Sequence, residues 1–374
     1  MPNILTSLIS KQTLKYGERA AFSFKAEPQG KWIDTSWNEF SRKVDMAACS
    51  LEILGMEPEA TVGVFSANRP EILITDFAAF ANRVVPVSIY STSSEEQVEY
   101  IVNDARINML FVGNEEQYHI ARKVQKRSRH IQQIVVYQNI NLQPDDCRTM
   151  TFDSFLKLGE AAGESCHEVV ESRRSSATGN DLATLLYTSG TTGEPKGAML
   201  THDCFNAALD IHLERLPMLS DKDTSLSHIF EKAWTFFCLL KGMKVYINHD
   251  PRDIQNSIRE VHPTCMCSVP RFWEKVYAAV QAKISRMNPL QKLLVKRALA
   301  VGARRNLDYV RLGRKVPAWL AAQYRFYDSK VFAPMRKVIG IEHGNIFPTA
   351  GAPLSANIVE FLHSCGINIV IGYG

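Results

Sequence analysis

The sequence lacks any run of about 18 apolar residues, the length that a membrane-spanning helix requires. None of its eight cysteines belongs to a Cys-x-x-Cys pair. Cys265 and Cys267 with His262 are the best candidates for metal ligands, but they are too few for a zinc site, and the pattern favours a core strand. The N-terminus lacks a basic region followed by an apolar one, which is the pattern of a secretory signal. The net charge of +4 is too small to indicate nucleic acid as a partner. These absences predict a cytoplasmic protein with reduced thiols.

Two common nucleotide-binding signatures are also missing. No G-x-G-x-x-G follows the strand-like segments between residues 61 and 140, so a dinucleotide site is not supported. The phosphate loop of nucleotide hydrolases, G-x-x-x-x-G-K-[ST], fails as well, because Lys196 follows a proline and precedes Gly197.

Strand-like and helix-like segments alternate along the first half of the chain, a pattern typical of an α/β fold. Apolar runs of strand length alternate with helical patterns between residues 61 and 137. Such alternation predicts a parallel sheet with helices on its faces. We expect residues 1–60 to form helices and a hairpin that pack on the large domain. Residues 61–180 should form a first α/β subdomain that ends in a polar connector from 141 to 180, and residues 181–374 a second one with a helical insertion at 283–330.

The stretch 187–197 is the strongest functional signal. It follows an apolar run, 183–187, that predicts a buried strand, and it holds three glycines, four aliphatic hydroxyls and one lysine. Glycines bring backbone N–H groups close to an anion, hydroxyls add donors, and a lysine brings a mobile positive charge. The alternative is a surface turn that binds nothing. The candidate phosphate ligands are Thr188, Ser189, Gly190, Thr191, Thr192, Gly193 and Lys196.

With its Ser/Thr/Gly-rich course and its Pro-Lys-Gly ending, this stretch resembles the signature of the adenylate-forming enzymes. That family includes acyl-CoA synthetases, luciferases and the adenylation domains of peptide synthetases. The resemblance implies the family's N-terminal large domain, with two mixed, mostly parallel sheets flanked by helices. It also implies ATP and Mg²⁺ as cofactors, with Lys196 in a catalytic role and Thr188 as a metal contact.

Two further segments match the family in the right order. The turn 350–354 follows a strand, and in the family this turn lies against the adenine of ATP; its candidate residues are Gly351, Ala352 and Pro353. Tyr373 and Gly374 end the chain where the family has a tyrosine that stacks on adenine. The family continues with a glutamate for magnesium and a C-terminal lid that carries a catalytic lysine. We therefore expect that the 374 residues alone make no acyl-CoA.

The segment 226–231 resembles the Pro-Leu-x-His-x-Phe-Glu stretch of long-chain acyl-CoA synthetases, where the histidine stands near the acyl carboxylate. His228 is thus a candidate catalytic residue, although a lone histidine beside aromatics is more often a packed core residue. Only four residues separate Asp223 from His228, fewer than in the family. This shortening predicts that the strand before His228 is interrupted near Leu226 and Ser227.

Residues 283–315 carry ten Lys and Arg residues against one acidic residue, Asp308, with apolar residues interleaved. This pattern is suited to an anionic membrane surface, at the inner face of the membrane. A solvated helical face is an equal alternative. We assign a smaller basic run at 122–129 to a solvated helix.

Together these features predict an ATP-dependent fatty acid–CoA ligase of the long-chain group, an AMP-binding enzyme of fatty acid metabolism. A fatty acid carboxylate would be converted to an acyl adenylate and then to a thioester of coenzyme A. Two alternatives stay open. The chain could belong to a ligase for an aryl or amino acid, or it could bind nucleotide without catalysis.

Overall fold

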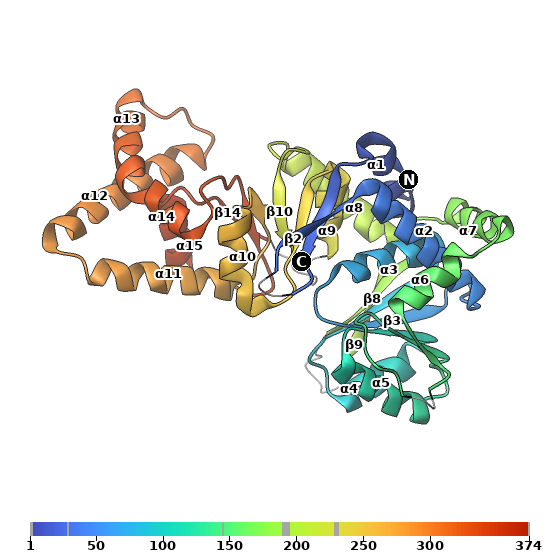
Figure 1. Cartoon of the computed structure of the whole chain (residues 1–374). Helices are drawn as coiled ribbons and strands as arrows, with labels where there is room; N and C mark the ends of the chain where they lie inside the picture. Colours follow the sequence, from blue (N-terminus) through green and yellow to red (C-terminus); the bar gives the residue numbers. More distant parts are fainter. Residues whose placement is uncertain (1–2, 28–29, 144–145, 189–194, 228–231, 373–374) are drawn as a thin grey trace. The chain divides into compact units, whose positions relative to one another are not determined.

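The computed structural model describes residues 3–27, 30–143, 146–188, 195–227 and 232–372. Its contacts divide the chain into two compact units (Figure 1). Unit 1 comprises Met1–Pro217 and Thr235–Gly242, and unit 2 comprises Met218–Trp234 and Met243–Gly374. The units divide near residue 217 rather than at residue 180. The reason is that the two strands on either side of the predicted phosphate-binding stretch 187–197, here called the phosphate stretch, both belong to the sheet of unit 1.

Unit 1 contains a seven-stranded sheet in the order β7-β6-β5-β3-β4-β8-β9. All its neighbouring strands are parallel except β8 and β9, which are antiparallel. The predicted parallel sheet is therefore confirmed. Its strands are β3 (Thr61–Phe65), β4 (Val85–Ile89), β5 (Met109–Val112), β6 (Gln133–Val136), β7 (Thr149–Thr151), β8 (Leu182–Thr188) and β9 (Lys196–Thr201). The predicted hairpin also forms, from β1 (Ala20–Lys25) and β2 (Trp32–Ser36).

The helices of unit 1 begin where the sequence places capping residues. Ser36, Ser94 and Asn114 each accept a hydrogen bond from a backbone N–H of the helix that follows. Pro70 occupies the first turn of α3, where its missing N–H costs nothing. The helices are α1 (Ile4–Tyr16), α2 (Trp37–Ile53), α3 (Pro70–Ala81), α4 (Glu95–Asp104), α5 (Glu115–Arg127), α6 (Phe152–Glu160), α7 (Glu164–Ser176), α8 (His202–Arg215) and most of α9 (Lys232–Lys241).

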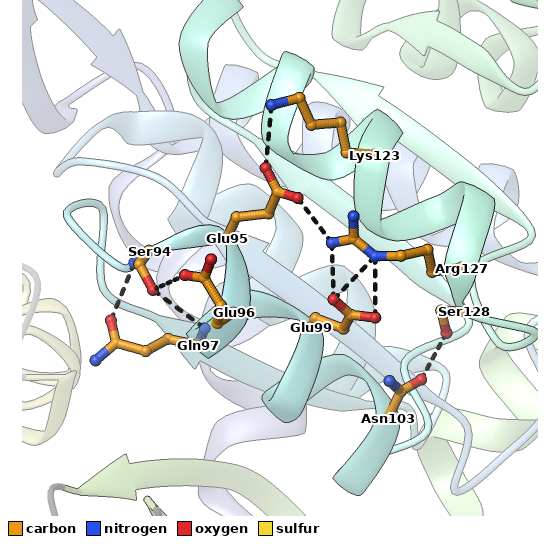
Figure 2. A network of polar contacts seen from close by, with 9 residues as sticks. All are labelled: Ser94, Glu95, Glu96, Gln97, Glu99, Asn103, Lys123, Arg127 and Ser128. Atoms are coloured by element: carbon orange, nitrogen blue, oxygen red, sulfur yellow. Dashed lines mark hydrogen bonds and ion pairs between the residues drawn. The ribbon is translucent and has the colours of Figure 1, made fainter.

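Helices α4 and α5 cover one face of this sheet. They bury apolar residues against β3, β4, β5, β6 and β8 in one core cluster. Their outer sides are joined by ion pairs, as Figure 2 shows: Arg127 contacts Glu95 at 2.8 Å and Glu99 at 2.7 Å. Lys123 contacts Glu95 at 3.1 Å. The basic run at 122–129 is therefore not simply solvated, and Arg122 is 8% exposed and pairs with Asp146.

The expectation of a polar connector from 141 to 180 is wrong. This segment adds the strand β7 to the sheet edge and two helices, α6 and α7. Helix α6 buries Phe152, Phe155 and Leu156. Helix α7 buries only Cys166 and Val170, so its sequence has almost no apolar stripe to reveal it.

The strands of unit 2 are parallel to one another. They are β10 (Thr224–Ser227), β11 (Lys244–Ile247), β12 (Cys265–Met266), β13 (Phe347–Thr349) and β14 (Ile369–Ile371). Strand β10 pairs with both β11 and β12, and β13 pairs with β14. Single bridges from Cys265 to Ile346 and from Ser268 to Thr349 connect the two sets. The predicted interruption is wrong, because Leu226 and Ser227 pair in register with Tyr246 and Ile247.

Helices make up most of the rest of unit 2 (Figure 1). They are η1 (Pro251–Asp253), α10 (Ile254–Val261), α11 (Pro270–Ser285), α12 (Pro289–Arg305), the π-helical turn η2 (Asn306–Val310), α13 (Ala318–Tyr327), the π-helical turn η3 (Asp328–Phe332), α14 (Ala333–Ile339) and α15 (Ala356–Ser364). The predicted helical region is thus confirmed from α11 to α14. Among the described helices of the chain, none is long and apolar enough to cross a membrane.

Candidate active site

The phosphate stretch forms a hairpin at the edge of the unit 1 sheet. Thr188 ends β8 and Lys196 begins β9, and the two residues lie directly opposite each other in the antiparallel pair. Opposed residues in such a pair have Cβ atoms about 4.5–5.5 Å apart on one face of the sheet. Both residues are exposed. The hairpin therefore presents a hydroxyl and an ammonium group side by side.

Between these two residues lie five of the predicted phosphate ligands. Ser189, Gly190, Thr191, Thr192 and Gly193 are outside the residues that the structure describes. The ends of the loop are nevertheless fixed by β8 and β9, which pair from Leu182 to Thr188.

Tyr187 anchors the hairpin from the opposite face. Its side chain is 5% exposed and belongs to the core cluster under α4 and α5. Its hydroxyl donates a 2.5 Å hydrogen bond to a carboxylate oxygen of Asp104, at the end of α4. Burial, followed by this hydrogen bond and the nearby carboxylate charge, raises the pKa of the Tyr187 phenol. The phenol therefore stays protonated and serves as a structural donor.

Gly197 lies opposite Tyr187 in the same pair of strands. A Cβ atom at this glycine would lie 3.1–3.3 Å from the ring and hydroxyl of Tyr187. That is tighter than ordinary contact, so the ring covers the place where a side chain would stand. Packing against Tyr187 thus gives a structural reason for the glycine that follows Lys196.

The base of the hairpin is fixed by a second set of contacts. Asp181, just before β8, pairs with Arg83 at 2.7 Å and accepts hydrogen bonds from Thr178. Burial alone would raise the pKa of the Asp181 carboxyl, but the hydrogen bonds from Arg83 and Thr178 outweigh it and lower that pKa. The backbone N–H of His202, just after β9, donates to the backbone oxygen of Asp181 at 3.0 Å.

The imidazole of His202 is buried at the start of α8. It is 1% exposed and lies edge-on to the ring of Phe80, with 5.2 Å between the ring centroids. Burial lowers its pKa to about 4, against the opposing effect of the Asp181 and Asp203 carboxylates. His202 is therefore neutral at physiological pH.

The hairpin stands at an edge where ligands bind in open α/β sheets. Strand β4 runs parallel to β8, with Ser88 opposite Leu186, so both strands end at the same edge. Tyr90 follows β4 at this edge and is 47% exposed. The sequence did not single out Tyr90, since the parallel pairing that brings it beside the hairpin joins residues about 98 positions apart.

In unit 2 the predicted adenine turn follows β13. Gly351 has a φ of +92°, a conformation that favours glycine, and Gly351, Ala352 and Pro353 are all exposed. The start of the turn is held by Ser268, whose backbone oxygen accepts hydrogen bonds from the Thr349 hydroxyl at 2.9 Å and the Ala350 N–H at 3.2 Å. An open, anchored turn of small residues suits the approach of a flat base.

Two other predicted segments leave the unit 2 sheet at the same edge as this turn. Strand β10 leads to His228, and β14 leads toward Tyr373 and Gly374. These three residues lie outside the described part of the chain. Because β10, β13 and β14 are parallel members of one connected set of strands, their carboxyl ends share an edge.

The described residues do not by themselves fit a magnesium site. No group of three or more His, Cys, Asp or Glu side chains within the described ranges could hold a metal ion. Thr188 contributes a single hydroxyl oxygen, whereas Mg²⁺ prefers carboxylates together with water or substrate phosphates. The eight cysteines are all free thiols, five of them buried.

A family model described as AMP-binding enzyme matches residues 9–374 of this chain. The long-chain-fatty-acid–CoA ligase ACSBG2 of Xenopus laevis is 28% identical over 386 residues, which cover 100% of this chain and 51% of the relative. The fatty acyl-CoA synthetase A of Dictyostelium discoideum is also 28% identical, over 92% of this chain and 50% of its own length. The chain therefore spans about half the length of the curated relatives it matches.

Solved structures share the fold. The long-chain-fatty-acid-CoA ligase FadD1 of Archaeoglobus fulgidus aligns with a TM-score of 0.66 and 18% identity, over 99% of this chain and 64% of its own. The anthranilate CoA ligase AuaEII, solved with anthranoyl-AMP, aligns with a TM-score of 0.67 and 14% identity, over 99% of this chain and 60% of its own. At these identities the likeness establishes the predicted α/β architecture.

Proposed function

Because this chain belongs to the AMP-binding enzyme family, we propose that it forms the nucleotide-binding and acid-binding part of an ATP-dependent long-chain fatty acyl-CoA synthetase. The observation that carries the proposal is the hairpin that sets Thr188 opposite Lys196 at the carboxyl edge of the unit 1 sheet. The names of the curated relatives favour a fatty acid over an aryl or amino acid as the substrate.

The proposed reaction begins with two anions. A carboxylate oxygen of the fatty acid attacks the α-phosphorus of ATP, a new oxygen–phosphorus bond forms, and pyrophosphate leaves with the electron pair of the broken bond. Lys196 offsets negative charge on the β- and γ-phosphates, and the Thr188 hydroxyl donates to a phosphate oxygen. The thiol of coenzyme A then attacks the acyl carbonyl and releases AMP. In this scheme His228 contacts the acyl carboxylate, and magnesium stays a prediction from the family resemblance.

Position is the main contribution of the fold to this chemistry. Thr188 and Lys196 are placed by strand pairing on one side and by the buried Tyr187 on the other. The pairing fixes the backbone from which the hydroxyl and the ammonium group extend before the substrate binds, and a favourable orientation contributes strongly to the rate. The turn at Gly351 supplies an open surface for the adenine ring.

We also propose that the helical region of unit 2 contacts an anionic membrane. Leu290 and Leu293 on α12 are 79% and 47% exposed, and the exposed cations Lys292, Lys296 and Arg297 lie on the same helix. On α13, Trp319 is 50% exposed. Apolar, aromatic and basic side chains exposed together are typical of a surface that rests on a lipid headgroup layer. This contact would place a cytoplasmic enzyme at the source of its fatty acid.

The decisive test replaces Lys196 by Ala and measures ATP binding by the 374-residue chain. Pyrophosphate exchange is measured, in the presence of hexadecanoate, benzoate or an amino acid, in a longer protein that joins this chain to the family's magnesium glutamate and C-terminal lid. We expect binding to fall about 10- to 100-fold, because a hydrogen bond to a charged group contributes about 1.5–3 kcal/mol. Lys157→Ala, an exposed lysine on α6, is the matched control and should leave binding unchanged.

Three outcomes are informative. Exchange that depends on hexadecanoate supports the fatty acid assignment, and exchange that depends only on benzoate or an amino acid contradicts it. ATP binding without exchange on any acid favours a nucleotide-binding chain without catalysis. Unchanged ATP binding by the Lys196→Ala variant would show that the hairpin is not the phosphate site.

A further inference from the structure

A cavity of about 520 Å³ lies within unit 2, and none of its lining residues belongs to the segments 187–197, 350–354 or 373–374. Its lining residues come from helices α10, α11, α12, α14 and α15, which Figure 1 labels, and from the turn η3 and neighbouring residues. The lining is mostly apolar, and includes Val280, Ile284, Leu294, Leu299 and Met335. A volume between about 300 and 1,000 Å³ is typical of sites for one small organic ligand.

The same cavity is bordered by positive charge alone. Its polar lining consists of Arg259, Lys275, Lys283 and Lys330 with two glutamines, and none of its lining residues, all of them described, is acidic. The ammonium groups of Lys275, Lys283 and Lys330 form no ion pair with any carboxylate in the described ranges. The guanidinium of Arg259 donates to the backbone oxygen of Val338, at 3.2 Å.

Part of the apolar lining is open to water. Val338 is 56% exposed and Leu294 is 36% exposed, although both lie at the cavity. Apolar surface of this kind is costly in water, and a hydrocarbon occupant would remove that cost. A polar occupant would gain little from walls that offer few hydrogen-bond partners.

Taken together, an apolar cavity and three bordering lysines that form no ion pair among the described residues match a ligand with one hydrocarbon chain and one negative charge. We propose that this cavity binds a free long-chain fatty acid, with the chain among the apolar side chains of α11, α12 and α14 and the carboxylate near the lysines. The inference goes beyond the proposed function, because binding here requires neither ATP nor the phosphate hairpin. It describes a second lipid site, which would hold fatty acid beside the helices that we expect to face the membrane.

The test is photolabelling of the 374-residue chain with a hexadecanoate analogue that carries a diazirine in its chain, without ATP, followed by mass spectrometry of the labelled peptides. The informative variant is Ala279→Trp, because Ala279 lines the cavity from α11 and a tryptophan there would occupy its volume. Ala282→Trp is the matched control: Ala282 lies on the same helix and is also exposed, but it does not line the cavity. Both substitutions are at exposed positions, so the fold should tolerate them.

We expect the label on peptides of α11, α12 and α14. The extent of labelling should fall at least tenfold in the Ala279→Trp variant and should not change in the Ala282→Trp variant. Unlabelled saturated acids should compete with a gain of about fourfold for each added methylene, from about 0.8 kcal/mol per buried CH₂ group. The methyl ester, which has no charge, should compete more weakly than the acid. The double variant Lys275→Gln with Lys283→Gln should bind the hexadecanoate analogue more weakly. The double variant Lys292→Gln with Lys296→Gln, whose lysines lie outside the cavity, should bind it as well as the parent chain does.

Labelling must also persist in Lys196→Ala, which separates this site from the proposed reaction. Labels confined to other segments, or equal labelling of both tryptophan variants, would overturn the proposal. The proposal also fails if Ala279→Trp converts a dimer to a monomer without affecting labelling, since the cavity would then be a contact between two copies. A phospholipid vesicle that protects the cavity from labelling while hexadecanoate does not would likewise assign it to membrane lipid instead.

Discussion

Acid should weaken the base of the phosphate hairpin through one buried histidine. The pKa of His202 is about 4 in the folded chain and 6.5 in an exposed histidine. Between these values the unfolded chain binds a proton that the folded chain does not, so stability falls as the pH falls from about 6.5 toward 4. The full pKa difference corresponds to about 3 kcal/mol in the free energy of unfolding. About 2 kcal/mol of that stability is lost between pH 7.5 and pH 5.

The structure says why the imidazole resists protonation. His202 is 1% exposed beside the ring of Phe80, and its Nδ1 atom has no hydrogen-bond partner in the described part of the chain. A charged imidazole here would lose its hydration without gaining an acceptor. Replacement by phenylalanine keeps a ring against Phe80 and removes the titration. We therefore expect His202→Phe to be at least as stable as the parent chain at pH 5.

Hydrogen exchange of the peptides from β9 and α8 is the suitable measurement, because it reports local opening and does not require the two units to unfold together. After correction for the intrinsic pH dependence of exchange, the parent chain should lose about 2 kcal/mol of protection between pH 7.5 and 5 that His202→Phe retains. His119→Phe, at a histidine side chain that is 51% exposed, is the control. Equal losses in the parent chain and in His202→Phe would refute the reasoning.

Two further predictions concern packing and surface charge. Gly197→Ala should reduce the stability of the hairpin by about 1–3 kcal/mol in hydrogen exchange, since the new Cβ meets the ring of Tyr187, and a second change, Tyr187→Leu, should recover part of the loss. If Tyr187→Leu recovers none of the lost stability, the contact between the new Cβ and the Tyr187 ring is not the cause of the loss. The affinity of the chain for vesicles with anionic lipids should fall steeply as the salt concentration rises from about 0.1 to 1 M. Equal binding to neutral vesicles would favour a solvated face at 283–315.

Most strands of unit 1 could be predicted from the sequence because each is a short apolar run, and the helices between them begin at recognisable capping residues. Strand β9 could not, since an edge strand with little burial shows no apolar alternation. Helix α7 escaped for a similar reason, because only Cys166 and Val170 on it are buried.

The site was predictable in its residue types but not in its supports. The composition of the stretch 187–197 pointed to phosphate, and a strand before it was visible as an apolar run. The contact between Tyr187 and Asp104 joins residues 83 positions apart, and the pair formed by Arg83 and Asp181 spans 98. No local sequence pattern encodes a contact between residues so far apart along the chain. The cavity of unit 2 is beyond sequence reasoning for the same reason, since six separate elements build it.

The position of Lys196 depends on the register of an exposed edge strand, which is the least protected kind of pairing in a sheet. A slip of one residue would turn this lysine toward the core face that Tyr187 occupies. Two contacts oppose such a slip. The Tyr187 ring lies close over Gly197, where a Cβ atom would stand 3.1–3.3 Å from it, and the backbone oxygen of Asp181 accepts a hydrogen bond from the backbone N–H of His202 at the far end of β9. Residues outside the proposed phosphate ligands therefore determine where the charge of Lys196 points. A side chain introduced at Gly197 should accordingly reduce nucleotide binding even though Thr188 and Lys196 stay intact.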